Sequence, residues 1–184
     1  MKLVMDKISD KVLFYDEVIG ISRQYYRKII KNPYKKIGSA TKTSTLHLLL
    51  FIIFTLLIIL FMMIDAVSLE LGWFALGCYI LGIFFQIALL INVRKTINKA
   101  VTRDNLCEII INKDEVIFEN KVVGRVVKLK WDDVNFILIA DRSISFLPKK
   151  NVVGENAIFC SRDYEKEILE MISRYDRDNL IIRN

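Results

Sequence analysis

The chain has 184 residues, of which 53% are hydrophobic, and it carries a formal net charge of +6 at pH 7. Its apolar residues are concentrated in two uncharged runs, which excludes an ordinary soluble protein with one evenly filled core. The only histidine is His47, and the chain has no C-x-x-C, G-x-x-x-x-G-K or G-x-G-x-x-G motif. We therefore expect no zinc site, no Cys/His or Ser/His catalytic pair and no phosphate-binding loop, and we predict a protein that is not an enzyme and holds no metal or cofactor.

Residues 1–45 form an N-terminal arm that is basic and has a helical repeat. Its side chains at residues 5, 8, 12, 15, 19, 22, 26 and 29 step by three and four positions, which predicts one amphipathic helix with a stripe from Met5 to Ile29. We expect this helix to pack on the chain's own cytoplasmic domain or to lie along the membrane surface; a self-associating coiled coil is the alternative. Pro33 and Gly38 then end the helix before the first apolar run.

Residues 46–64 and 71–93 are uncharged apolar runs of 19 and 23 residues, with His47 neutral. As helices they would reach about 28 and 34 Å, enough to cross a hydrocarbon core about 30 Å thick. Because backbone polar groups in lipid must be paired within the segment, the connection at residues 65–70 is predicted to be a turn at the far interface. The sequence therefore predicts a transmembrane helical hairpin over residues 46–93, with Asp65 and Glu70 in its turn.

Basic residues flank the predicted hairpin on one side of the membrane. Residues 22–45 contain seven basic residues and no acidic one, and a basic linker at residues 94–105 follows the second span. The positive-inside rule then predicts a multi-pass protein of the cytoplasmic membrane with both termini in the cytoplasm. Nucleic acid is not expected as a partner, because the soluble domain is not basic. Nine basic side chains are predicted to contact anionic lipid headgroups of the inner leaflet: Arg27, Lys28, Lys31, Lys35, Lys36, Lys42, Arg94, Lys95 and Lys99.

One face of the second span carries Ala75, Cys78, Gly82 and Gln86 at helical spacing. Small residues let helices approach closely in lipid, and an amide there usually contacts a partner rather than acyl chains. We interpret this face as helix packing against the first span. A contact between copies, or a pore lining, is the alternative, and together with the stripe of the arm it leads us to expect a homo-oligomer.

From residue 106 the hydrophobic pattern changes to a period of two. The segments "CEIIINKDEVIFEN", "GRVVKLKW", "VNFILIA" and "SISFLP" predict antiparallel strands with turns at residues 112–114 and 141–142. A short strand "AIFC" and a helix capped by Ser161 follow. We predict an α+β membrane protein in which the helical hairpin is followed by a small antiparallel β-barrel or sheet, residues 106–175, closed by a C-terminal helix, with a tail at residues 176–184.

The order of two spans, a basic linker, "INKDEVIFEN", "KLKWDDVNFIL", "ISFLPKK" and a final amphipathic helix resembles the YcxB-like family of small bacterial membrane proteins. Trp131, Val134, Pro148 and Lys149 match the W-x-x-V/I step and the Pro-Lys element of that family. The resemblance covers residues 40–175 in architecture and residues 106–150 in motifs. It implies a cytoplasmic domain like a pleckstrin-homology (PH) barrel. The chain departs from the family by the insertion "NVVGENAIFC" and by its periodic arm.

From these features we expect a PH-like domain that senses or binds a ligand, a lipid headgroup or a protein partner at the inner leaflet. The layout also resembles two-transmembrane antiphage-defence effectors, in which the barrel binds a cyclic nucleotide and the helices oligomerise to disrupt the membrane. A membrane immunity protein against a bacteriocin or toxin is a further alternative. The basic residues predicted to bind a small anionic ligand, unless they form a solvated face, are Lys128, Lys130, Arg142, Lys149 and Lys150.

Overall fold

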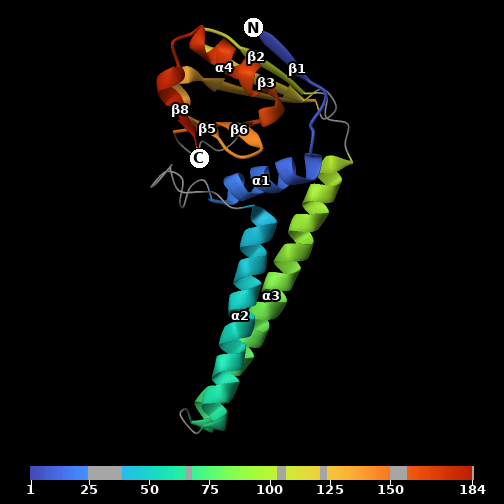
Figure 1. Ribbon diagram of the computed structural model, residues 1–184, viewed down its shortest axis with the longest axis vertical. Helices are drawn as coiled ribbons and strands as arrows, with labels where there is room; N and C mark the ends of the chain where they lie inside the picture. Colours follow the sequence, from blue (N-terminus) through green and yellow to red (C-terminus); the bar gives the residue numbers. More distant parts are fainter. Residues whose placement is uncertain (25–38, 65–67, 103–106, 121–123, 150–156, 184) are drawn as a thin grey trace.

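The computed structural model describes residues 1–24, 39–64, 68–102, 107–120, 124–149 and 157–183. Figure 1 shows a stem of two long helices, a β domain at one end of the stem, and a short helix between them. The α+β class, with two long apolar helices followed by antiparallel sheets and a C-terminal helix, is confirmed. The elements in chain order are β1 (Lys2–Met5), α1 (Lys11–Gln24), α2 (Ala40–Met63), α3 (Leu69–Val101), β2 (Cys107–Ile111), β3 (Glu115–Asn120), β4 (Arg125–Lys130), β5 (Val134–Ile139), β6 (Ser143–Pro148), β7 (Ile158–Ser161), α4 (Glu165–Ser173) and β8 (Ile181–Arg183).

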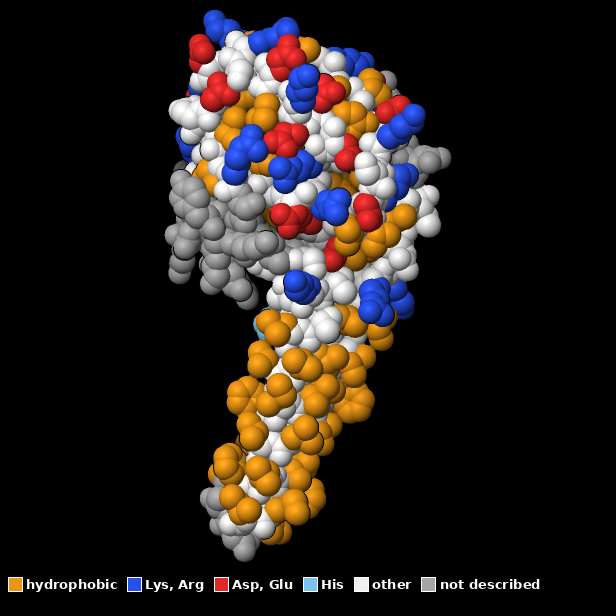
Figure 2. Space-filling model, viewed as in Figure 1, with side chains coloured by type: hydrophobic (Ala, Val, Ile, Leu, Met, Phe, Trp, Pro, Cys, Tyr) orange, Lys and Arg blue, Asp and Glu red, His pale blue; other side chains and the backbone are white. Residues whose placement is uncertain are grey.

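The stem consists of α2 and α3, and both helices are long enough and apolar enough to cross a membrane. Figure 2 shows its surface covered by hydrophobic side chains, whereas charged side chains gather on the β domain. Glycines of α3 let the two helices pack closely. A Cβ added at Gly82 would lie 2.5 Å from the Phe51 ring, and one added at Gly72 would lie 2.6 Å from the Met62 side chain.

The ends of the stem differ from the predicted spans. The interpretation of residues 94–105 as a linker is wrong for its first part, because α3 continues to Val101. Ile97 in this extension and Val93 just before it are buried and pack with Ala40 and α1, which explains why the helix persists beyond the apolar run. At the other end α3 begins at Leu69, inside the predicted turn, and residues 65–67 lie outside the described part of the chain.

The N-terminal arm is not one helix from Met5 to Ile29. Residues Lys2–Met5 form β1, which pairs antiparallel with β2, and Met5 is buried in the core of the β domain. The helix begins only at Lys11, after Asp10, whose Oδ1 accepts a hydrogen bond from the Leu13 amide at 3.1 Å. Asp is a preferred N-cap residue, so it fixes the helix start. The predicted part of the helix beyond Gln24 lies outside the described residues.

The β domain contains two four-stranded sheets, which we call sheet A (order β1-β2-β3-β4) and sheet B (order β7-β6-β5-β8). Its main core lies between the two sheets and α4, with fully buried side chains such as Ile109, Phe146 and Ile168. The predicted tail at residues 176–184 is wrong as a tail, because β8 pairs parallel with β5. Ser161 is an N-cap, as predicted, but of a short 3-10 turn (Arg162–Tyr164) that precedes α4.

Candidate functional site at the junction of the stem and the β domain

Helix α1 lies between the ends of the stem helices and the outer face of sheet B (Figure 1). Ile21 is fully buried on the sheet side, in a cluster with Phe136, Leu138, Ala140 and Leu147. Tyr15 and Ile19 lie on the other side of the helix, against a cluster of Ala40, Val93 and Ile97. The 100° step between helical residues places these two sets on opposite faces. Helix α1 therefore contacts both parts of the molecule at once.

Two buried carboxylates of α1, Asp16 and Glu17, point in different directions. Asp16 is 6% exposed, and its Oδ1 accepts hydrogen bonds from the backbone amide and the hydroxyl of Thr41, both at 2.9 Å. Glu17 is 8% exposed and accepts from the Arg142 amide at 3.0 and 3.1 Å and from the Ser143 hydroxyl at 2.6 Å. One carboxylate thus binds the start of α2, and the next binds the β5–β6 hairpin.

The position of Asp16 is electrostatically favourable. Thr41 lies in the first turn of α2, where amide groups without intrahelical partners and the positive end of the helix dipole attract an anion. The helix cap Ser39 already accepts from the Lys42 amide at 2.9 Å, so Asp16 adds a second acceptor for the same turn. A buried charge is costly unless hydrogen bonds compensate it. Asp16 and Glu17 both have that compensation, and each obtains it from a different part of the molecule.

Beside this junction lies a cavity of about 180 Å³, which we call the junction pocket. Residues 8–10 and Phe14 form one wall, the hairpin turn at residues 141–142 a second, and residues 161–163 a third. The Asp163 carboxylate joins two walls, because its Oδ2 accepts from the Ser9 amide at 2.8 Å and from the Ser161 hydroxyl at 2.9 Å. The hydrogen bond from the Ser9 amide is the largest cause that holds the pKa of Asp163 below its usual value. The hydrogen bond from Ser161 and the nearby charge of Arg142 lower this pKa further.

Arg162 is fixed at the edge of the junction pocket by three contacts. Its amide donates to the Arg142 carbonyl at 3.0 Å, its Nη1 donates to the Ala140 carbonyl at 3.2 Å, and its Nε donates to Glu165 at 2.7 Å. Glu165 also pairs with Arg183 at 2.7 Å. The hydrogen bond from Arg162 is the main cause that lowers the pKa of Glu165, with a further contribution from Arg183. Arg162 is therefore a preorganised cation.

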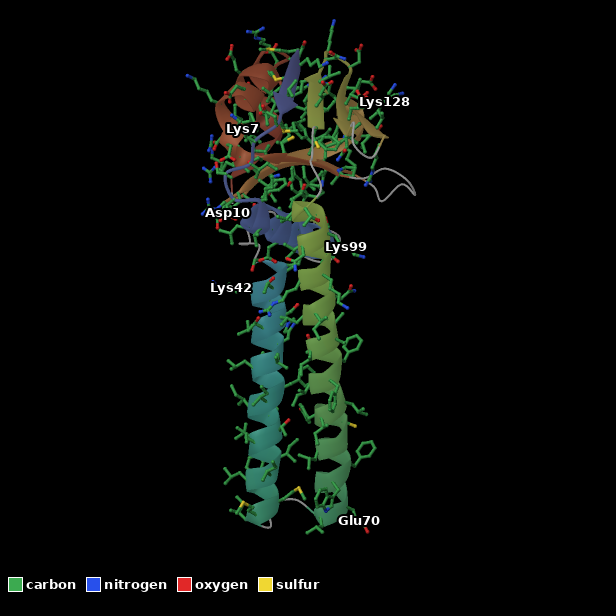
Figure 3. The ribbon with its side chains drawn as sticks, turned by 90° about the vertical axis from the view of Figure 1, so that its right-hand side faces the viewer. Lys7, Asp10, Lys42, Glu70, Lys99 and Lys128 are labelled. Carbon is green, nitrogen blue, oxygen red and sulfur yellow. The ribbon has the colours of Figure 1, made fainter. Side chains whose placement is uncertain are left out.

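The basic residues predicted to bind a ligand do not form one surface. Lys128 and Lys130 share the outer face of β4, opposite Ile117 and Glu115, and Figure 3 places Lys128 in the part of the β domain remote from the stem. Arg142 lies at the closed end of the β5–β6 hairpin, whereas Lys149 lies beyond its open end, where Val134 opposes Pro148. The structure therefore does not bring Arg142 and Lys149 together. Lys150 lies outside the described residues.

The predicted headgroup contacts lie partly within the described chain. Lys42, Arg94, Lys95 and Lys99 are exposed, and Figure 3 shows Lys42 and Lys99 near the stem ends, next to α1. The other predicted contacts, namely Arg27, Lys28, Lys31, Lys35 and Lys36, lie outside the described residues.

The predicted packing face of α3 is used within the chain, except at one position. Ala75, Gly82 and Gln86 are half-buried, and the contact of Gly82 with Phe51 shows that this side faces α2. Cys78 is exposed, so it does not belong to the contact between α2 and α3. The interpretation as packing between the two helices therefore accounts for Gly82 without a second copy of the chain.

The positions that match the predicted family motif, Trp131, Val134 and Pro148, lie in or next to the open end of the β5–β6 hairpin. Trp131 is buried and its indole Nε1 donates to the Asn112 carbonyl at 2.8 Å. Val134 opposes Pro148 in the register of β5 and β6, and the Lys149 amide donates to the Asp133 carbonyl at 2.7 Å. Trp131 thus binds the turn between β2 and β3, and Val134 and Pro148 pair within the hairpin, so all three residues have a structural role.

Sequence reasoning missed Asp16, Glu17 and the junction pocket. The available signal was the pair of adjacent carboxylates on a helix whose predicted stripe includes the nearby positions Tyr15 and Ile19. Within the described residues no group of three or more His, Cys, Asp or Glu side chains could hold a metal ion. Burial raises the pKa of Cys107 to about 11 and raises that of Cys160 further. Neither thiol is therefore activated as a nucleophile.

Comparison with known proteins adds no relative. No family model, no curated protein and no solved structure matches the chain. The resemblance to the YcxB-like family therefore stays a prediction from the motif residues.

Proposed function

We propose that the protein is a non-enzymatic, multi-pass protein of the cytoplasmic membrane whose PH-like β domain binds a ligand, lipid headgroup or protein partner, and that α1 transmits this binding to the membrane helices. The observation that carries the proposal is the pair of buried carboxylates in α1. Asp16 binds the first turn of α2, and Glu17 binds the turn end of the β5–β6 hairpin. A helix fixed to both parts moves with either of them.

The chemistry of these two contacts supports transmission rather than simple adhesion. Removing one partner of a buried, hydrogen-bonded charge leaves that charge uncompensated, which costs about 3–5 kcal/mol for buried ion pairs and less for neutral donors. A displacement of Arg142 and Ser143 therefore costs less free energy when α1 moves with them than when α1 stays in place. Because packed interfaces switch between discrete arrangements, a small shift of the hairpin is passed on to the start of α2.

Two further features support the membrane orientation. Lys42, Arg94, Lys95 and Lys99 are exposed at the end of the stem that carries the β domain, as the positive-inside rule expects of a cytoplasmic side. Strand β1 precedes the stem and strand β2 follows it, and the two strands pair. Both ends of the stem must then lie on the same side of any bilayer that it crosses.

Cysteine labelling tests the orientation. Ser68→Cys and Lys128→Cys are introduced singly into a chain whose three cysteines are replaced by alanine. In intact cells a membrane-impermeant maleimide should label the variant at residue 68, and the variant at residue 128 should react only after permeabilisation. The reverse pattern would refute the proposed localisation.

Hydrogen exchange of the full chain in nanodiscs tests the transmission through α1. Glu17→Gln should accelerate exchange not only at Arg142 and Ser143, which Glu17 contacts, but also in residues 39–45, which it does not contact. Glu167→Gln on the exposed side of α4 is the matched control and should change neither region. Unchanged exchange in residues 39–45 of the variant would show that α1 does not couple the two parts.

The junction pocket does not favour the cyclic-nucleotide effector. Its 180 Å³ lies below the roughly 300 Å³ at which sites for drug-sized ligands begin. This pocket suits a smaller ligand than a nucleotide. No specific observation in the described residues supports the immunity protein.

A further inference from the structure

We propose that the junction pocket binds a small zwitterion, a molecule that carries a carboxylate or phosphate and an ammonium group a few bonds apart. This inference rests on the proposed function, because it names the ligand class of the domain whose binding α1 transmits. The pocket has three walls that are far apart in the sequence, namely residues 8–14, 141–142 and 161–163. Its 180 Å³ greatly exceeds the roughly 10–15 Å³ needed to admit one water.

Two arginines occupy opposed positions at the pocket. Ser143 and Ser161 are partners in the register of β6 and β7, and the next pair outward is Arg142 and Arg162, joined by the hydrogen bond from the Arg162 amide to the Arg142 carbonyl. Like charges directly opposite each other on adjacent strands are destabilising. Arg162 is compensated by Glu165. Within the described residues Arg142 forms no ion pair. Its charge interacts with that of Asp163, but the Asp163 carboxylate already accepts hydrogen bonds from Ser9 and Ser161.

The carboxylate of Asp141 completes the set of groups that a ligand can use. It lines the pocket beside Arg142, and within the described chain it accepts no hydrogen bond and forms no ion pair. The other two carboxylates of the pocket have structural roles, since Asp10 caps α1 and Asp163 joins two walls. One anion and one cation, adjacent in the sequence, are therefore left at the hairpin turn.

The charges around the pocket select a ligand with both signs. A simple anion would be attracted by the guanidinium groups but repelled by Asp141, Asp163 and Asp10; a simple cation would meet the two arginines. A zwitterion places its carboxylate or phosphate on the Arg142 fork, which binds such groups with two parallel hydrogen bonds, and its ammonium on Asp141. The same chemistry occurs in free amino acids and phosphoethanolamine and in the headgroup of phosphatidylethanolamine.

The position of the pocket gives the ligand access to α1. The amide of Arg142 is held by Glu17, so the residue that would grip the ligand through its side chain is bound to α1 through its backbone. Phe14 of α1 lines the same pocket. A ligand that draws Arg142 inward therefore acts on α1 through two contacts, and through Asp16 on the first turn of α2.

Calorimetric titration of the full chain in nanodiscs tests the site, with O-phosphoethanolamine and glycine as probes and inorganic phosphate and ethanolamine as single-charge analogues. The zwitterions should bind saturably, and each analogue should bind more weakly by about tenfold or more, the effect of losing one hydrogen-bonded charge contact. Arg142→Gln and Asp141→Asn should each weaken zwitterion binding by a similar factor. The matched controls Arg174→Gln and Asp132→Asn, at exposed sites remote from the pocket, should leave it unchanged. Unaltered tryptophan fluorescence shows that each variant is folded.

The results distinguish a soluble ligand from a lipid headgroup, and they distinguish failure of this site from failure of the proposed function. Binding that is equal in phosphatidylethanolamine and phosphatidylcholine nanodiscs assigns a soluble ligand, whereas binding blocked by phosphatidylethanolamine assigns its headgroup. Three results would refute the proposed site: no saturable binding, equal binding of phosphate alone, or binding that is unchanged in both pocket variants. If the site fails while Glu17→Gln still accelerates exchange in residues 39–45, the coupling through α1 stands without this ligand.

Discussion

Sheet B is buried on both faces, whereas sheet A is buried on one. All six residues of β6 are buried, and five of the six in β5. In β4 only Val127 and Leu129 are buried, and in β3 only Val116. The difference arises because α1 covers the second face of sheet B, while the outer face of sheet A carries Lys128 and Lys130. Sheet B can therefore pass a structural change from the core to the stem, and sheet A is the solvated side.

The largest effect is expected from a charge placed under α1. Ile21→Asp puts an unpaired carboxylate among Phe136, Leu138 and Leu147, and it should lower the free energy of unfolding by about 3–5 kcal/mol. A charge of the opposite sign at Val4, Val4→Lys, lies at a position that is 41% exposed on the outer face of sheet A and opposes Glu108, so it should cost about 0.5 kcal/mol or less. Urea unfolding followed by Trp131 fluorescence, in a chain with Trp73→Phe, measures both. Equal effects would mean that α1 does not cover sheet B.

A smaller effect is expected from the hydroxyl that binds Glu17. Ser143→Ala removes a donor from a buried carboxylate and should cost about 1–3 kcal/mol in unfolding free energy. Ser145 provides the matched control, because it points to the same face of β6 and is buried, but its hydroxyl has no hydrogen-bond partner among the described residues. Ser145→Ala should be neutral or slightly stabilising by the same unfolding measurement. A loss at Ser145 as large as that at Ser143 would contradict the role of Glu17.

Acid should weaken the contact that joins the N-terminal segment to sheet B. The folded pKa of Asp163 is depressed below 3.8, so Asp163 stabilises the fold above that value and loses this contribution as the pH falls through the lower folded pKa. Because the side chain is largely exposed, the effect should be smaller than that of Ser143→Ala. Asp163→Asn should flatten the decline of unfolding free energy as the pH falls below 3.8. A steeper decline in this variant would show that the sign is wrong.

The smallest effect is expected on the open face of sheet A. Lys128→Ala should change the unfolding free energy by about 0.5 kcal/mol or less, since the side chain is exposed and opposes Ile117 rather than a charge. Lys130→Ala removes a cross-strand neighbour of Glu115 and should cost about 0.2–1 kcal/mol. Urea unfolding measures both. A loss above this range would indicate that sheet A has a covered outer face.

Much of the fold follows from local patterns, and the parts that do not follow depend on distant partners. The alternation in "GRVVKLKW" correctly assigns Val127 and Leu129 to the core, because one face of β4 meets water. In "SISFLP" the serines alternate with apolar residues although all six positions are buried, whereas the unbroken apolar run "FILIA" is typical of a strand covered on both faces. The apolar run predicts burial on both faces, but it does not reveal which segment covers the second face of the sheet.

Other features were missed because sequence spacing cannot supply the partner. Met5 fits a helical stripe and also fits an edge strand, and the choice depends on β2, about a hundred residues later. Asp16 and Glu17 looked like ordinary solvated residues, because their donors come from Thr41, Arg142 and Ser143. Arg142 and Lys149 are near in sequence, but they lie at opposite ends of strand β6 and are therefore not neighbours in the fold.

The pairing of β1 with β2 has a consequence for how the chain is made. Strand β1 leaves the ribosome before the stem does, and about 100 residues, both stem helices included, separate Met5 from Cys107. At roughly 5–20 residues per second, synthesis of this interval takes about 5–20 s. During that time the first strand has no partner, because both stem helices are synthesised before β2. Sheet A can therefore close only after the stem has been made, and a fragment covering residues 105–184 would lack a strand that the complete sheet contains.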